Sequence, residues 1–133
     1  MKKIEHIGIA VSDLEAANKT YEAVMGKPHY KTEAVLGEGV NTSFFEIGES
    51  KIELLAAISA DSAIAKSILK RGEGIHHIAF AVDDIEVEIN RLKNGGFRLL
   101  NEQPKQGADN KLVAFMHPKD ANGVLIELCQ EIR

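Results

Sequence analysis

The chain has 133 residues, with 16 lysines and arginines against 20 aspartates and glutamates, and a formal net charge of -4. This length corresponds to about one average domain, and it can bury a core without disulfides or a structural metal. Hydrophobic residues make up 44% and charged residues 27%, which excludes a disordered chain. The negative balance disfavours nucleic-acid binding, which usually needs a basic face, so we expect no nucleic-acid partner.

Cysteine content and the lengths of the apolar segments indicate a location. The single cysteine, Cys129, cannot form an internal disulfide, which favours a reducing compartment. No apolar run approaches the length of a membrane span. Glu5 and His6 interrupt the apolar N-terminal stretch, which argues against a signal peptide. We therefore expect a soluble, cytoplasmic protein that does not associate with a membrane.

An internal repeat determines the architecture. The segment IEHIGIAVSDLE, from Ile4, matches IHHIAFAVDDIE, from Ile75, with 7 of 12 positions identical. A second pair of similar segments closes the two halves: KIELL, from Lys51, and LIELC, from Leu125. The repeat period is too long for a solenoid, so the sequence predicts two copies of one module.

Each copy begins with a predicted strand and helix. Residues 4–11 and 75–82 are short and rich in Ile and Val, which is typical of strands. Ser12 and Asp83 each stand three residues before a glutamate, a pattern that predicts a helix start. The two helices are expected to end at Gly26 and Gly95-Gly96, with Leu14, Ala17, Tyr21 and Val24 on the apolar face of the first and Ile85, Ile89 and Leu92 on that of the second.

Apolar segments with turn signals between them follow each helix. We predict strands at residues 40–47, 51–56, 97–102, 112–116 and 123–130, a polar flexible loop at 103–111, and a connecting helix at 61–70 that ends at Gly72. Each module is then a strand, a helix and two or three strands. We expect an α+β fold and one domain, with module one at about 1–60, the connecting helix at about 61–71 and module two at about 72–133.

The histidines of the repeat face unusually small neighbours. Strand alternation places His6 on one face with Gly8 and Ala10, and His77 with Ala79 and Ala81. A strand face of this composition makes a poor core surface but a good cavity wall. His76 alternates away from His77 and is expected to be structural or exposed, and we assign no role to His29 and His117.

Two glutamates occupy matching positions in the last strand of each module. Glu53 and Glu127 each lie between apolar neighbours, where an unpaired carboxylate is costly unless a cation binds it. Alone, His6 or Glu53 would more often be an incidental strand residue, but both positions recur in the repeat. Two imidazoles and two carboxylates suit one octahedral divalent ion, Co2+, Mn2+, Ni2+ or Zn2+, with two positions left for water or substrate.

These modules resemble the vicinal oxygen chelate superfamily, which includes glyoxalase I, extradiol dioxygenases and methylmalonyl-CoA epimerases. The resemblance implies βαβββ modules, two of which form a half-open barrel around a metal site. Three segments are similar to the epimerase branch: SAIAKSILKRGEGIHHIAFAVDDI from Ser62, NEQPKQGADNKLVAFMHPKDANGVLIEL from Asn101, and GVNTSFFEIGESKIELL from Gly39. The resemblance covers nearly the whole chain.

The resemblance implies His6, Glu53, His77 and Glu127 as the metal ligands. Some epimerases have Gln in place of Glu53, so this ligand does not choose between cobalt and the other metals. The implied activity interconverts (R)- and (S)-methylmalonyl-CoA in propionate metabolism, by proton abstraction and return through a metal-stabilised enolate. The implied partners are an acyl-CoA substrate and a second copy of the chain in a homodimer.

Glu127 is the expected acid/base on one face of the substrate, but the opposite-face residue is not fixed. Thr42 stands where a related bacterial epimerase has a catalytic glutamate, so we expect it to contact substrate rather than to act as a base. Glu46 lies on the Thr42 strand face and is a second catalytic candidate, and a metal-bound water or a further residue is the alternative on the opposite face of the substrate. Lys111, like Lys105, is a candidate for the coenzyme A phosphates. A glyoxalase I-type lyase and a metal-free binding protein of the same fold are the alternative functions.

Overall fold

The computed structural model describes residues 1–132, which divide into two compact units. One unit, called here the terminal unit, holds Met1–His6 and the chain from His77 onward. The other, the central unit, holds Ile7–His76. The division cuts the two repeated strands, so His6 and His77 belong to the same unit although they come from different modules. That the chain forms one domain with the module boundaries given above stays a prediction.

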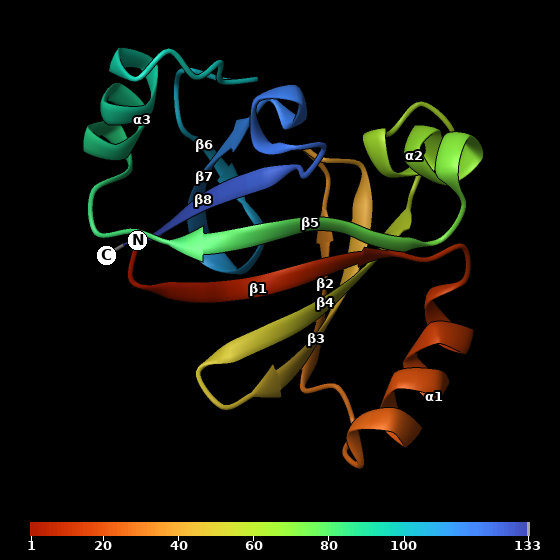
Figure 1. Ribbon diagram of the computed structural model, residues 1–133. Coiled ribbons are helices and arrows are strands. Elements are labelled where there is room, and N and C mark those ends of the chain that lie inside the picture. The colour runs from red at the N-terminus through yellow and green to blue at the C-terminus, as the bar shows by residue number, and fades with distance from the viewer. Residues whose placement is uncertain (133) are drawn as a thin grey trace. The chain divides into compact units, whose positions relative to one another are not determined.

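The order of helices and strands is a βαβββ module, a connecting helix and a second βαβββ module (Figure 1). The first module and the connecting helix comprise β1 (Lys3–Ala10), α1 (Leu14–Met25), β2 (Lys31–Val35), β3 (Val40–Ile47), β4 (Ser50–Ala57) and α2 (Ala63–Arg71). The second module comprises β5 (Gly74–Ala81), α3 (Ile85–Asn94), β6 (Lys105–Gly107), β7 (Lys111–Met116) and β8 (Ile126–Glu131), with short 3-10 helices at Ala108–Asn110 and Pro118–Ala121. The predicted α+β class and the two tandem modules are confirmed.

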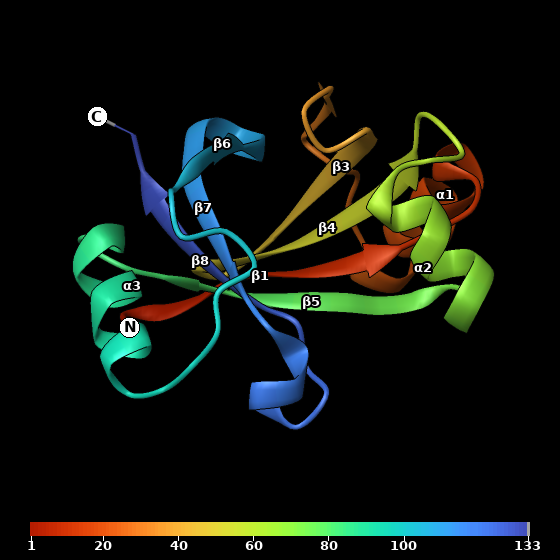
Figure 2. The same ribbon diagram turned by 90° about the horizontal axis from the view of Figure 1, so that it is seen from above.

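In the terminal unit, the C-terminal half of β5 pairs in parallel with β8, which pairs antiparallel with β7 (Figure 2). In this register Glu127 of β8 stands between Ala79 of β5 and Phe115 of β7. Helix α3 packs its buried Ile85, Ile89 and Leu92 onto this sheet, as the helical spacing predicts. The helix and the strands form the core that fixes the position of Glu127.

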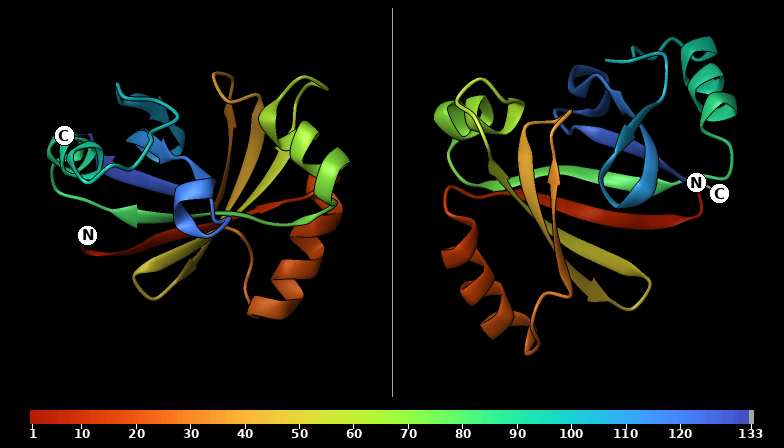
Figure 3. Two further views of the ribbon diagram at one scale, coloured as in Figure 1. Left: turned by 45° about the horizontal axis from the view of Figure 1, so that its top comes forward. Right: turned by 180° about the vertical axis from the view of Figure 1, so that it is seen from behind.

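In the central unit, β3 pairs antiparallel with β2 and β4, and α1 packs against β3 and β4 (Figure 3). Leu14, Ala17 and Tyr21 face this core as predicted. The fourth predicted position was wrong, because Val24 is 72% exposed and Met25 takes its place against the core. None of the helices within residues 1–132 is both long and apolar enough to cross a membrane.

The predicted helix starts were one residue early. The N-caps are Asp13 and Asp84, whose carboxylates accept hydrogen bonds from backbone amides of the first helical turn. Asp satisfies these otherwise unpaired N–H groups as well as Ser does. The amide of Ser12 instead donates to the carboxylate of Glu73 at 2.7 Å. The predicted ends at Gly26 and Gly72 are confirmed, and Gly26 adopts the left-handed conformation that favours glycine.

The edge strands differ most from the sequence prediction. The strand predicted at residues 97–102 is wrong: Leu99 forms an isolated bridge to Met116, and the second strand of the module is β6, inside the predicted loop. The Asn101 side chain competes with strand pairing there by bonding the backbone of Phe115 and Val113. The short strand β2 was not predicted either, because Lys31–Val35 alternates without a clear apolar face.

Candidate metal centre

The repeated strands place two histidines on buried faces. On β1, His6, Gly8 and Ala10 are buried while Ile7 and Ile9 are partly exposed, so the predicted alternation is confirmed. On β5 the same pattern buries His77 with its two alanines. The small neighbours leave room beside each imidazole ring, and the two rings meet edge to face with centroids 5.1 Å apart.

Three side chains of the terminal unit converge on one point. The Nε2 atoms of His6 and His77 are 3.0 Å apart, and Oε1 of Glu127 lies 3.5 Å from the first and 3.0 Å from the second. All three residues are at most 5% exposed. Phe115 stands edge-on to the His77 ring.

These separations fit one divalent ion. Ligand atoms about 2.1 Å from an ion stand about 3.0 Å apart at octahedral angles and about 3.4 Å apart at tetrahedral angles. The observed distances of 3.0, 3.0 and 3.5 Å lie close to these two values. Two imidazole nitrogens and one carboxylate oxygen also form a donor set that suits first-row divalent transition metals better than it suits Ca2+ or Mg2+. His6, His77 and Glu127 therefore form a group that can hold a metal ion.

Glu127 is a carboxylate held in its charged form. Burial alone would raise its pKa, but hydrogen bonds from His6 and His77, and then their charges, lower the pKa below its usual range. Its second oxygen, Oε2, accepts a hydrogen bond from the thiol of Cys129 at 2.8 Å. Both oxygens of this buried carboxylate therefore have polar partners.

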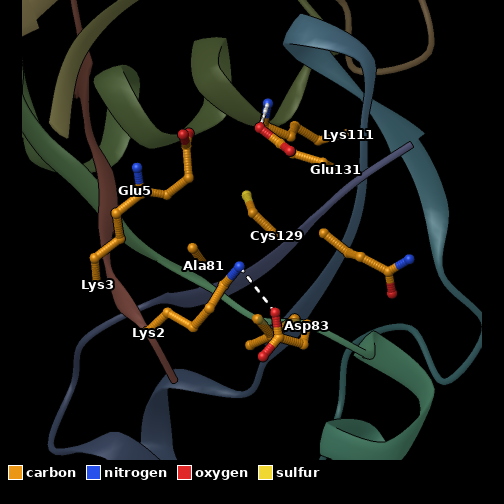
Figure 4. Close-up of a pocket in the computed structure, with 10 residues that line it drawn as sticks. Lys2, Lys3, Glu5, Ala81, Asp83, Lys111, Cys129 and Glu131 are labelled. Carbon is orange, nitrogen blue, oxygen red and sulfur yellow. Dashed lines mark ion pairs between the residues drawn. The ribbon is translucent and has the colours of Figure 1, made fainter. Parts of the chain in front are cut away.

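A second buried carboxylate adjoins the cluster. Oε1 of Glu5 lies 2.8 Å from Nδ1 of His6, on the side of the ring away from His77, and Glu5 is 5% exposed. Glu5 and Cys129 line a pocket of about 530 Å³ together with Lys111 and Glu131 (Figure 4). In Figure 4 the Glu5 and Cys129 side chains, from β1 and β8, turn toward the same space. The pocket therefore reaches the contacts behind the metal-ligand candidates.

The central unit holds the other predicted site residues. Glu53 is buried on β4, where its cross-strand neighbour is Phe44 of β3. Thr42 of β3 is fully buried, and its hydroxyl has no hydrogen-bond partner among residues 1–132. Glu46 is exposed near the end of β3, opposite Lys51. The roles of all three stay predictions.

Lys111 is buried within the pocket, at 9% exposure. Its ammonium group donates a hydrogen bond to the backbone carbonyl of Asp109 at 3.4 Å. The same group lies 3.7 Å from the side-chain carboxylate of Asp109 and 3.9 Å from that of Glu131. These contacts are long, so the charge is only loosely compensated. The predicted role of Lys111 in binding an anionic group of the ligand stays a prediction.

Residues 5–115 match the family described as the Glyoxalase/Bleomycin resistance protein/Dioxygenase superfamily. The match spans most of the chain and both repeated histidines. The chain belongs to this superfamily. The vicinal oxygen chelate resemblance of the repeat is thereby confirmed.

Several proteins that resemble this chain along nearly its whole length are named as epimerases. The ethylmalonyl-CoA/methylmalonyl-CoA epimerase of Cereibacter sphaeroides is 42% identical, over 96% of this chain and 97% of its own. The human mitochondrial methylmalonyl-CoA epimerase is 40% identical, over 96% of this chain and 73% of its own. A solved methylmalonyl-CoA epimerase variant from Streptomyces coelicolor, in complex with 2-nitronate-propionyl-CoA, is 36% identical with a TM-score of 0.94, covering 98% and 95% of the two chains.

Sequence reasoning missed Glu5 and the contact of Cys129. Neighbouring strand residues point to opposite faces, so the alternation that predicts the site of His6 excludes Glu5 from it. Cys129 was predicted as a small buried side chain, which is confirmed, but its hydrogen bond to Glu127 was not predicted. One available signal was that both residues break the repeat, since His76 and Leu55 stand at the matching positions.

Proposed function

We propose that this superfamily member is a metal-dependent epimerase that interconverts (R)- and (S)-methylmalonyl-CoA. The observation that carries the proposal is the convergence of His6, His77 and Glu127 within one buried cluster. The similarity to epimerases along nearly the whole chain supports the same activity. Glu53 completes the proposed ligand set as a second carboxylate.

The reaction removes a proton from the carbon between a thioester and a carboxylate and returns one to the opposite face. A bound divalent ion would supply Lewis-acid stabilisation of negative charge on the substrate oxygens. His6 and His77 would hold the ion, and Phe115 packs edge-on against the His77 ring. Glu127 accepts the proton as a carboxylate, and the electron pair of the broken C–H bond is delocalised over the neighbouring carbonyl groups.

The opposite face of the substrate carbon needs its own proton donor. Thr42 brings a buried hydroxyl that can donate a hydrogen bond to a substrate oxygen, but a hydroxyl is too weak an acid to serve as an ordinary base. Glu46 is exposed, which counts against a place beside the reacting carbon. We propose water as the proton carrier on this face, with Thr42 and Lys111 binding the substrate.

The relatives support the acyl-CoA class of substrate. The Streptomyces structure holds a nitronate, a planar anion whose charge lies on oxygen atoms, as it does in an enolate. The Cereibacter protein is named for both ethylmalonyl-CoA and methylmalonyl-CoA, so the alkyl group that this chain prefers is part of the proposal. A cytoplasmic location, which the single cysteine favours, and a homodimer also belong to the proposal.

Deuterium exchange at C2 of methylmalonyl-CoA tests the proposed function. We expect exchange and epimerisation with the metal-loaded protein, and loss of both after treatment with a chelator and removal of the ion. The hemithioacetal of methylglyoxal and glutathione, assayed at the same protein concentration, serves as the competing substrate. A clear preference for the glutathione adduct would assign a glyoxalase I-type activity instead.

A further inference from the structure

Two of the converging side chains are each held at the atom that faces away from the cluster. His6 offers Nε2 to the cluster, while its Nδ1 lies 2.8 Å from the Glu5 carboxylate. Glu127 offers Oε1, while its Oε2 accepts the Cys129 thiol at 2.8 Å. Each contact therefore involves the one polar atom of the side chain that the cluster does not use.

The contact with Glu5 determines the tautomer of His6. An ionised carboxylate only accepts hydrogen bonds, so the ring proton of neutral His6 lies on Nδ1 and is donated to Glu5. The lone pair is then on Nε2, which is the atom that points at His77 and Glu127. A carboxylate behind a histidine ligand also fixes the ring orientation and raises the basicity of the ligand nitrogen.

The contact with Cys129 determines which oxygen of Glu127 is presented. The thiol has one hydrogen, and its position 2.8 Å from Oε2 directs that hydrogen to this oxygen. Rotation of the carboxylate would break the bond, so Oε1 stays directed at the two histidines. Cys129 is 2% exposed and lies in the core beside Ala79 and Val113, which restricts its side chain.

The repeat gives an independent reason to assign these two residues to the site. Both modules keep the histidine and the glutamate, but only the first has a carboxylate before its histidine, and only the second has a thiol two residues after its glutamate. Glu5 and Cys129 also lie close enough together, with His6, to form a second group of potential metal ligands. A buried carboxylate and a buried thiol that touch two candidate ligands do not follow from the module pattern alone.

We propose that Glu5 and Cys129 are positioning residues, which select Nε2 of His6 and Oε1 of Glu127 as the metal-binding atoms. The inference rests on the proposed metal-dependent function. It predicts that losing either contact weakens metal binding and changes the ligand field without unfolding the chain.

Binding of Co2+ to the full chain, followed by its visible absorption, tests this inference. We expect Glu5→Gln and Cys129→Ala each to weaken the affinity for Co2+ by about 10–100-fold, the usual effect of losing a contact behind a metal ligand. The absorption bands of the bound ion should shift in both variants, while the thermal unfolding of the ion-free proteins stays close to wild type. Cys129→Ser keeps a hydrogen-bond donor and should restore most of the affinity.

The matched control is Glu22→Gln, which removes a carboxylate 2.7 Å from Nδ1 of His29 in the central unit. This pair has the same chemistry but includes no residue of the cluster, so Co2+ binding should not change. Wild-type affinity and absorption in both Glu5→Gln and Cys129→Ala would overturn the inference while leaving the proposed function intact. Loss of turnover in Glu5→Gln with unchanged Co2+ binding would also overturn it, because Glu5 would then act on a proton. A wild-type protein that binds no divalent ion would overturn the proposed function as well.

Discussion

The two copies of the repeated module preserve the same histidine and glutamate but surround them differently. In the first copy Glu5 precedes His6, and in the second His76 precedes His77. Glu5 is buried against its histidine, whereas His76 is partly exposed. A duplicated sequence therefore supplies the candidate ligands in pairs, while the contacts behind them differ between the copies.

The last strands of the modules differ in the same way. Glu127 has Cys129 two residues later, and the thiol bonds its carboxylate, whereas Leu55 occupies the matching position after Glu53. Three of the four predicted ligands also lie in the terminal unit, and the central unit holds only Glu53. The two copies share the histidine and glutamate positions but differ in the contacts that surround these residues. Each prediction below compares one pair of positions.

The largest difference is expected between the two glutamates. Glu127→Gln should lower turnover by about 10²–10⁴-fold, the usual effect of losing a general base. Glu53→Gln should lose less activity, because the amide oxygen of glutamine can still bind a metal ion. Steady-state kinetics of both variants, with the metal content of each measured, make the comparison. Equal losses at equal metal content would show that the two copies contribute alike.

Substitutions of the two histidines of the second copy are expected to differ almost as much in their effect on metal affinity. His77→Ala removes a candidate ligand and should weaken binding of a divalent ion by more than the about 10–100-fold that an outer contact contributes. His76→Ala, one position earlier on the same strand, should bind the ion with nearly wild-type affinity. Isothermal titration with Zn2+ or Co2+ measures both. The four-ligand site is wrong if His77→Ala binds as tightly as wild type.

The cores of the two units offer a comparison of stability. Leu54 and Leu128 occupy matching positions, and both are fully buried in the cores of their own units. Either Leu→Ala change should lower the free energy of unfolding by about 2–5 kcal/mol. Leu69→Ala, at a position 89% exposed, should stay within about 0.5 kcal/mol of wild type. Urea unfolding should show one transition if the chain is one domain; two separate transitions, each sensitive to one leucine, would make the units independent.

The repeat made the fold and the centre of the site predictable from the sequence. Because side chains alternate between the two faces of a strand, each histidine must share a face with the small residues two and four positions later. The buried faces of β1 and β5 were therefore assigned correctly. The same helical spacing predicted Ile85, Ile89 and Leu92 as the buried face of α3. These features depend on local periodicity, which tertiary context did not override.

Features that depend on single side chains could not be predicted this way. Strand alternation places Glu5 opposite His6, but a long flexible carboxylate can reach back to its neighbour's ring, and no pattern encodes that choice. The strand β6 has three residues, too few to show a period, and it pairs with β7 across the short 3-10 helix Ala108–Asn110, within a segment whose polar residues are typical of a loop. The spacing of two residues places Cys129 and Glu127 on the same face of β8, but it does not predict that the thiol donates a hydrogen bond to the carboxylate.

The smallest effect is expected at Glu46, where the alternation argument and the structure point in different directions. Glu46 shares a strand face with Thr42, but four residues along a strand correspond to about 13 Å, a large distance to span at one substrate carbon. Thr42 is fully buried while Glu46 is exposed opposite Lys51, so the environment of the face changes along β3. Glu46→Gln keeps the shape and removes the charge, and we expect turnover within about twofold of wild type, since loss of a true general base costs about 10²–10⁴-fold. A loss of turnover beyond tenfold in Glu46→Gln would instead make Glu46 the opposite-face base and remove water from that role.

Thr42→Val is the companion variant on the same strand. If the Thr42 hydroxyl binds substrate, KM should rise while kcat changes little. The free energy of unfolding should not fall, because the hydroxyl has no protein partner within residues 1–132.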